Sequence, residues 1–297
     1  MEDKARRAHS VPEEIIHYYE MGLEATRFSS AAGQLEFVRT KEIISRYLPQ
    51  APAVVLDVGG GPGTYAQWLS REGFEVHLID PIALHGEQAR EASRRQPTSP
   101  IRSITVGDAR ELAYPDECAD LVLLLGPLYH LTERPDRLLA VREARRVLRP
   151  RGQLVAVAIS RFASTFAGLA QGHLQDSAFL EMMRRCLNDG QHRNPTHEPG
   201  HFTTSFHHHS SELEAEIEEA GFCVETLLAI EGVAVFLQDL EQQWRDSARR
   251  ERILEVLRWL EDEPTIMGAS AHIAAVATKR AKPARPSPRR SRTYRDR

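Results

Sequence analysis

Short apolar runs alternate with helical segments through the middle of the chain. Because parallel strands are buried on both faces, each appears as a continuous apolar run, and a helix must connect it to the next. The pattern therefore predicts an α/β fold built on a Rossmann-like, doubly wound sheet. The apolar runs lie at 53–58, 74–79, 101–106, 121–125 and 153–159, and the helical segments between them lie at 64–71, 84–95 and 136–148.

The segments on either side of this series are organised differently. Two helices are predicted before it, one opened by a capping box of Ser10 and Glu13 and one at 35–48. From residue 160 to 210 the alternation stops and Gly, His, Asn and Pro become frequent, which predicts an insertion after the fifth strand. A second capping box, Ser211 with Glu214, opens a short helix, followed by a strand at 223–230, a helix at 237–260 and a strand at 272–278.

These features divide the chain into three expected parts. Residues 1–50 form an N-terminal helical segment, and residues 51–280 form the main domain with its insertion at 160–210. Residues 281–297 are a Pro-rich, basic tail that has too few large apolar side chains to fold, and we expect it to be disordered.

Four glycines and a proline, GGGPG at 59–63, directly follow the first apolar run. A glycine-rich turn between a strand and a helix start presents backbone N–H groups that a ligand can approach closely. Asp80, at the end of the next run, is placed to accept hydrogen bonds from both ribose hydroxyls of a nucleoside-bearing cofactor. Gly61, Gly63 and Ala66 also match the dinucleotide pattern GxGxxG/A, so an NAD-dependent oxidoreductase stays open at this point.

Five motifs together resemble those of the class I S-adenosylmethionine-dependent methyltransferases. They are LDVGGGPG, HLIDP, GDAREL, DLVLLLGPLYHL and RVLRPRGQLVAVAIS, with Arg151 where many members have Gly. The later segment FTTSFHHHSSELEAEIEEAGF resembles a bacterial subgroup with small-molecule or unassigned substrates. The resemblance implies S-adenosylmethionine as the cofactor and a sheet of seven strands with the last strand antiparallel.

The resemblance also implies a cofactor-binding role for particular residues. Gly59, Gly61 and Gly63 would line the methionine and ribose portions, Asp57 would orient the loop and the cofactor's amino group, and Asp80 would hold the ribose. The other implied cofactor-binding residues are Pro81 beside Asp80, Asp108 and Ala109 at the adenine, and Leu125 and Gly126 at the methionine portion. We also expect Tyr19 and Arg27 to bind the cofactor, from an N-terminal helix that could close over it as a lid.

Methyl transfer from a sulfonium is a direct displacement, so the protein mainly aligns the reactants and excludes water. The resemblance places Tyr129 and His130 over the methyl group. We expect His130 to act as a general base or as a substrate orienter, because imidazole titrates near neutral pH. Whether the acceptor atom is N, O or C stays open. The candidate substrate-binding residues are Arg161, Phe162, Phe206 and His207.

Histidines gather in the run HEPGHFTTSFHHH at 197–209. No two of them lie at i, i+4 on a predicted helix, and Pro199 with Gly200 interrupts the run. Zinc sites usually show more regular ligand spacing. We therefore expect no metal here, and a loop whose alternating positions face the pocket.

Charge is distributed unevenly along the chain. The tail carries +6, and the chain as a whole carries −4, which leaves −10 for residues 1–280. Nucleic-acid binding depends on Lys and Arg at phosphates, so this balance favours a small-molecule acceptor over nucleic acid. A nucleic-acid or protein methyltransferase and a cofactor-binding protein without activity are the alternatives. We expect a monomer or a homodimer.

Three widely spaced cysteines indicate a reducing compartment rather than a disulfide framework. The first residues are charged, and no apolar run approaches the length of a membrane span. The sequence therefore predicts a cytoplasmic protein without membrane contact.

Overall fold

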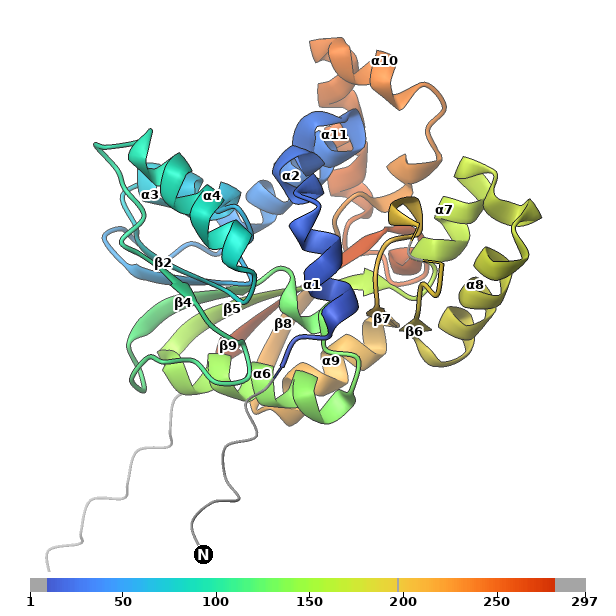
Figure 1. The fold of residues 1–297 in the computed structure, drawn as a ribbon. Coiled ribbons are helices and arrows are strands. Elements are labelled where there is room, and N and C mark those ends of the chain that lie inside the picture. Colours follow the sequence, from blue (N-terminus) through green and yellow to red (C-terminus); the bar gives the residue numbers. More distant parts are fainter. Residues whose placement is uncertain (1–9, 197, 281–297) are drawn as a thin grey trace, which may run out of the picture.

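The computed structural model describes residues 10–196 and 198–280, and a single mixed sheet forms its centre (Figure 1). The main sheet has the strand order β3-β2-β1-β4-β5-β9-β8. Strands β1 to β5 run parallel, and β9 runs antiparallel to β5 and β8, as the resemblance implies. The strands are β1 (Val54–Val58), β2 (Glu75–Asp80), β3 (Ser103–Val106), β4 (Ala119–Leu124), β5 (Leu148–Ser160), β8 (Phe222–Ala229) and β9 (His272–Lys279).

Helices cover both faces of this sheet, and alternate strand residues face each layer. On one face Val55, Leu78 and Leu123 pack against α2 (Ala31–Arg46), α3 (Thr64–Arg71) and α4 (Ala83–Arg94). On the other face Leu56 and Val122 pack against α6 (Arg134–Val147) and α9 (Ser210–Glu219). This two-sided burial explains why the strands read as continuous apolar runs.

The N-terminal region divides into a helix over the sheet edge and a helix within a layer. α1 (Glu13–Glu20) lies across the carboxyl ends of the strands, and the 3₁₀ helix η1 (Leu23–Ser29) links it to α2 (Figure 1). Ile43 and Ile44 of α2 belong to the sheet core. Of the predicted helical segment at 1–50, α1 and η1 are therefore the parts that lie over the end of the sheet.

The insertion forms a compact flank beside the end of β5. It contains α7 (Ala163–Gln171), η2 (His173–Gln175), α8 (Ser177–Asp189), β6 (Gln191–His192), η3 (Pro199–His201) and β7 (Ser205–His208). β7 pairs with Ile159 and Ser160, and Ile159 also pairs with β9. β7 therefore lies on the β4 side of β5, beyond the end of β4, where it meets the short helix α5 (Pro127–His130).

Several details differ from the sequence-based prediction. The helix expected at 237–260 is two helices, α10 (Leu240–Arg245) and α11 (Ser247–Leu260), because Asp246 accepts the N–H groups that begin α11. η4 (Gly232–Phe236) precedes them and η5 (Met267–Ala269) follows. Both predicted capping boxes are wrong: α1 begins after Pro12 without a side-chain cap, and His209 with Glu212 caps α9.

No helix within residues 10–196 and 198–280 is long and apolar enough to cross a membrane. The tail predicted to be disordered, 281–297, lies outside the described residues.

Candidate active site

A cavity of about 290 Å³ lies at the carboxyl ends of β1, β2 and β4, beneath α1. The loops that follow these strands form its floor, and residues of α1, η1 and α2 form its roof. Of the residues predicted to bind cofactor or to act in catalysis, all but Gly63 line this cavity: Tyr19, Arg27, Asp57, Gly59, Gly61, Asp80, Pro81, Asp108, Ala109, Leu125, Gly126, Tyr129 and His130.

The glycine turn uses its glycines for different purposes. Gly59 has a φ of +71°, and a Cβ there would lie 2.7 Å from Pro127, so the turn and α5 can approach only without a side chain. Gly61 has a φ of +55°, and its Cβ would meet only Glu24, at 3.7 Å. A side chain at Gly61 would therefore enter the cavity, which makes this backbone a surface for a ligand.

Gly63 does not line the cavity. Its φ is +85°, and a Cβ would lie 3.1–3.3 Å from Leu78, Ala89 and Ile101. The glycine instead lets α3 start close to the sheet core, so its part in the motif is helix packing.

Asp57 is a completely buried carboxylate whose two oxygens have no hydrogen-bond partner among the described residues. Burial and then the neighbouring Asp80 raise the pKa of Asp57 to about 7. The Ala66 N–H offsets part of this shift, although the contact lacks hydrogen-bond geometry. A buried, unpartnered carboxylate next to an open glycine backbone fits a cationic group of a bound cofactor.

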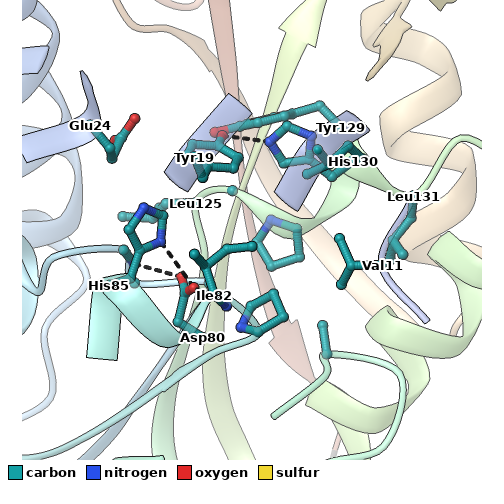
Figure 2. A pocket seen from close by; sticks show the side chains of 18 of the residues that line it. Val11, Tyr19, Glu24, Asp80, Ile82, His85, Leu125, Tyr129, His130 and Leu131 are labelled. Carbon is teal, nitrogen blue, oxygen red and sulfur yellow. Dashed lines mark hydrogen bonds and ion pairs between the residues drawn. The ribbon is translucent and has the colours of Figure 1, made fainter. Parts of the chain in front are cut away.

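Asp80 ends β2 with its carboxylate fully engaged. One oxygen accepts the Gly61 N–H at 2.9 Å, and the other accepts the Ile82 N–H at 2.9 Å and lies 3.0 Å from His85 Nδ1 (Figure 2). These contacts join the glycine turn to the start of α4. The carboxylate is thus held at the cavity floor, at the position that the resemblance assigns to the ribose.

Asp108 and Ala109, expected at the adenine, lie on the loop after β3. Asp108 is bound at both oxygens by Arg110, with Nη2–Oδ2 at 2.7 Å and Nε–Oδ1 at 2.9 Å. Arg110 also reaches Asp136 at 2.8 Å, which ties this loop to α6. Arg110 itself lines the cavity.

His130 and Tyr19 meet above the cavity, from α5 and α1 (Figure 2). The Tyr19 hydroxyl lies 2.6 Å from His130 Nε2, and His130 Nδ1 lies 3.3 Å from the Thr204 carbonyl. Because a carbonyl can only accept, Nδ1 carries the proton and Nε2 accepts from Tyr19. Burial lowers the pKa of His130 to about 4, so the imidazole is neutral at pH 7.

Tyr129, which is buried, and Arg27, which is partly buried, form a second polar group. Arg27 binds Glu36, with Nη2–Oε1 at 2.5 Å, and Glu24 at 3.3 Å. Burial raises the pKa of Tyr129 to about 12, although the nearby Arg27 opposes the shift. This group gives one end of the cavity fixed positive and negative charges.

The structure places none of the four predicted substrate residues on the cavity wall. Arg161 binds Glu212 of α9 at 2.7 Å, and Phe206 packs 3.7 Å from the Arg137 guanidinium of α6. His207 stacks on His192, with ring centroids 4.9 Å apart. Phe162 packs on His209. Phe206 and His207 face inwards on β7, and Arg161 and Phe162 follow the end of β5, so the four side chains pack within the insertion and against α6 and α9 instead of lining the cavity.

Sequence reasoning missed several residues of the cavity. The apolar wall comes from Val11, Ile15, Ile82 and Leu131, and the polar wall includes Glu24, Glu36, Thr40 and His85. The i, i+3 spacing of Glu24 and Arg27 could have indicated an ion pair, which the structure shows. Val11 and Ile15 carry no such signal, because their role depends on where α1 crosses the sheet.

Comparisons with known proteins agree with this geometry. Residues 56–156 match the family model described as a methyltransferase domain. The methyltransferase GfsG of Streptomyces halstedii is 34% identical over 39% of this chain and 41% of its own length. The ubiquinone/menaquinone biosynthesis C-methyltransferase UbiE of Acidiphilium cryptum is 31% identical over 41% of this chain and 48% of its own length. The chain thus spans less than half the length of each of these curated relatives.

A solved structure extends the likeness to most of the fold. A SAM-dependent methyltransferase from Methanosarcina mazei superposes with a TM-score of 0.56, at 19% identity, over 81% of this chain and 98% of that protein. The glycine turn after β1 and the acidic end of β2 both lie within residues 56–156, which match the methyltransferase domain model. The chain therefore contains a domain of the class I S-adenosylmethionine-dependent methyltransferase family.

Proposed function

We propose that this protein transfers a methyl group from S-adenosylmethionine to a small-molecule acceptor. The observation that carries the proposal is the cavity beneath α1, in which Asp57, Asp80 and the Gly61 backbone lie on the floor. Bound S-adenosylmethionine would supply an electrophilic methyl group for direct displacement. The protein's part is to bind, align and exclude water.

The cover over the cavity supports a small acceptor. Ile15 and Tyr19 of α1 pack with Ile82 at one side. At the other side, the Thr203 hydroxyl donates to the Glu14 carbonyl at 3.2 Å, and the Thr204 hydroxyl to the Glu14 carboxylate at 3.1 Å. A nucleic acid or a folded protein would have to displace this helix to reach the site. The UbiE relative, named for quinone biosynthesis, supports the same class of acceptor.

His130 fits the role of an orienter better than that of a strong base. Its Nδ1–H donates to Thr204, and its Nε2 presents a lone pair to the Tyr19 hydroxyl. An acceptor hydroxyl or N–H that replaces Tyr19 at Nε2 would be held in a fixed direction. With a pKa of about 4, the imidazole would remove a proton only from an acceptor that becomes strongly acidic as the methyl group arrives.

A turnover assay tests the proposal. Purified protein with S-adenosylmethionine and a panel of phenols, quinols, amines and carboxylic acids should release S-adenosylhomocysteine with at least one small acceptor. Asp80→Ala should be much slower, and the exposed-site variant Asp262→Ala should match the unchanged protein. Methylation of bulk RNA, DNA or protein at a higher rate than that of any small acceptor would contradict the proposal of a small-molecule acceptor.

Calorimetry separates the remaining alternatives. Binding of S-adenosylhomocysteine without turnover of any acceptor would favour a cofactor-binding protein without activity, since a fold alone does not fix a function. Binding of NAD with no response to S-adenosylhomocysteine would overturn the proposal entirely.

A further inference from the structure

Three side chains able to bind a transition metal meet inside the insertion, outside the cavity. They are Cys186 of α8, His192 of β6 and His207 of β7, exposed by 1%, 2% and 3%. One ligand atom from each lies within 4.8 Å of the other two. All three come from different elements, so the cluster depends on how the insertion folds.

Hydrogen bonds fix which nitrogen of each histidine is free. His192 Nε2 lies 2.8 Å from the His201 carbonyl, so Nε2 carries the proton and Nδ1 keeps its lone pair. The Ser164 hydroxyl lies 3.0 Å from that Nδ1. At His207, Nε2 lies 3.2 Å from Ser205 Oγ, whose own proton goes to the Thr203 carbonyl.

His207 Nδ1 is therefore a lone pair with no hydrogen-bond partner, in a side chain that is almost completely buried. A buried polar atom without a partner needs an explanation, and an unfilled ligand position supplies one. Metal-binding histidines characteristically donate their other ring N–H to a carbonyl or another polar group, as both histidines do here.

We propose that Cys186, His192 and His207 bind a zinc ion that holds the insertion together. Zinc prefers thiolate and imidazole ligands, and binding would release the Cys186 proton to solvent as the sulfur–zinc bond forms. Ligand atoms on a tetrahedral zinc lie about 3.4–3.6 Å apart at normal bond lengths, so separations of up to 4.8 Å would contract by up to about 1.4 Å. The Ser164 hydroxyl or a water completes the coordination.

The site would act as a cross-link between α8, β6 and β7. Thr204 directly precedes β7, and its carbonyl accepts the Nδ1–H of His130. None of the three ligands lines the cavity. Zinc would therefore stabilise the wall behind His130 without taking part in methyl transfer, and the proposal is independent of the acceptor.

A second cluster with metal-ligand chemistry, Glu36 with Glu231 and His272, is satisfied without an ion. His272 Nδ1 lies 2.6 Å from Glu231, and Glu36 binds Arg27. Zinc belongs at the cysteine-containing cluster because only that one leaves a buried lone pair unpaired.

Metal analysis of the full chain tests the site. Protein produced in zinc-supplemented medium and then dialysed should retain about one zinc ion per chain, and zinc should raise the melting temperature by several degrees. Cobalt in place of zinc should give a sulfur-to-cobalt charge-transfer band. Cys186→Ser should abolish this band and lower zinc affinity at least tenfold, whereas the matched control Cys223→Ser should leave both unchanged.

The cobalt spectrum of the unchanged chain decides the matter even if Cys186→Ser fails to fold. Absence of stoichiometric metal, or cobalt bound without the sulfur band, would overturn the proposal. So would a metal lost in His272→Gln and retained in Cys186→Ser, because it would then lie in the other cluster.

Discussion

Asp57 and Asp80 lie near the ends of neighbouring strands, but their charges are stabilised differently. Asp80 accepts two backbone N–H groups and contacts His85, whereas Asp57 has no hydrogen-bond partner among the described residues. These hydrogen bonds hold the Asp80 carboxylate in place in the free protein. Asp57 holds its charge at a cost that a cationic ligand group would remove.

Asp80→Ala should weaken S-adenosylhomocysteine binding at least tenfold, measured by titration calorimetry. Each lost hydrogen bond to a charged group is worth about 1.5–3 kcal/mol. The variant should also melt at a lower temperature, because Asp80 joins the glycine turn to α4. Unchanged affinity would refute the proposed ribose contact, and Asp262→Ala serves as the control.

Asp57→Asn should stabilise the cofactor-free protein at pH 8 and weaken cofactor binding. The folded-state pKa of about 7 lies above the ordinary 3.8, so the protonated form favours folding. The contribution of Asp57 to the free energy of unfolding is fully present below about pH 4 and is lost as the pH rises through 7. An asparagine does not titrate, so its advantage should grow over this window to about 4 kcal/mol and stay level above it.

Denaturant unfolding of both proteins between pH 4 and pH 9 measures this difference. A difference that does not vary with pH would show that the Asp57 carboxylate is not destabilised by burial.

At the scale of elements, we propose that α1 sets how closed the site is. It is a short helix without a side-chain cap. Ile15 packs against Ile82, and Glu14 accepts hydrogen bonds from the Thr203 and Thr204 hydroxyls of the insertion. Helices this short gain most of their stability from packing. We therefore propose that its contacts with two parts of the domain control access to the cavity.

Ile15→Ala should speed cofactor release at least tenfold in stopped-flow measurements. Truncating a buried isoleucine removes about 2–5 kcal/mol of packing, and here the loss falls on the closed position of α1. The exposed neighbour Leu23→Ala should leave release unchanged. Equal release rates in all three proteins would show that α1 does not close the site.

The insertion illustrates how an element can support a site without lining it. Arg161, Phe206 and His207 bind α9, α6 and β6, and β7 then presents Thr204 to His130. The predicted substrate residues thus position the wall of the cavity from behind.

At the scale of the whole molecule, the chain joins an acidic part to a basic tail. Residues 1–280 carry −10 and residues 281–297 carry +6. The acidic part disfavours phosphate-rich acceptors, which agrees with the proposed small-molecule substrate.

Truncation after Arg280 should leave the melting temperature and the affinity for S-adenosylhomocysteine unchanged. The tail has almost no apolar side chains with which to pack, so we expect its removal to cost no buried surface. Differential scanning calorimetry of the two proteins checks this. A fall of several degrees would show that the tail docks on the domain.

The sequence by itself determined the sheet and the floor of the site. Two-sided burial gives each parallel strand an apolar run, and helix periodicity placed α3 at its observed bounds. The glycine turn directly follows β1 and Asp80 ends β2, and both were found because parallel strands bring their carboxyl ends to one edge. These signals are local, so a linear pattern carries them.

Only the tertiary structure decided the roof of the site and the contents of the insertion. Tyr19 and His130 meet although they lie 111 positions apart. The histidine run alone gave no metal pattern, because Cys186 and His192 lie outside it and join His207 only once α8 and β6 have folded beside β7. Both sets of contacts join elements that are far apart in the sequence and meet only through tertiary packing. The spacing of residues within one segment cannot predict such packing.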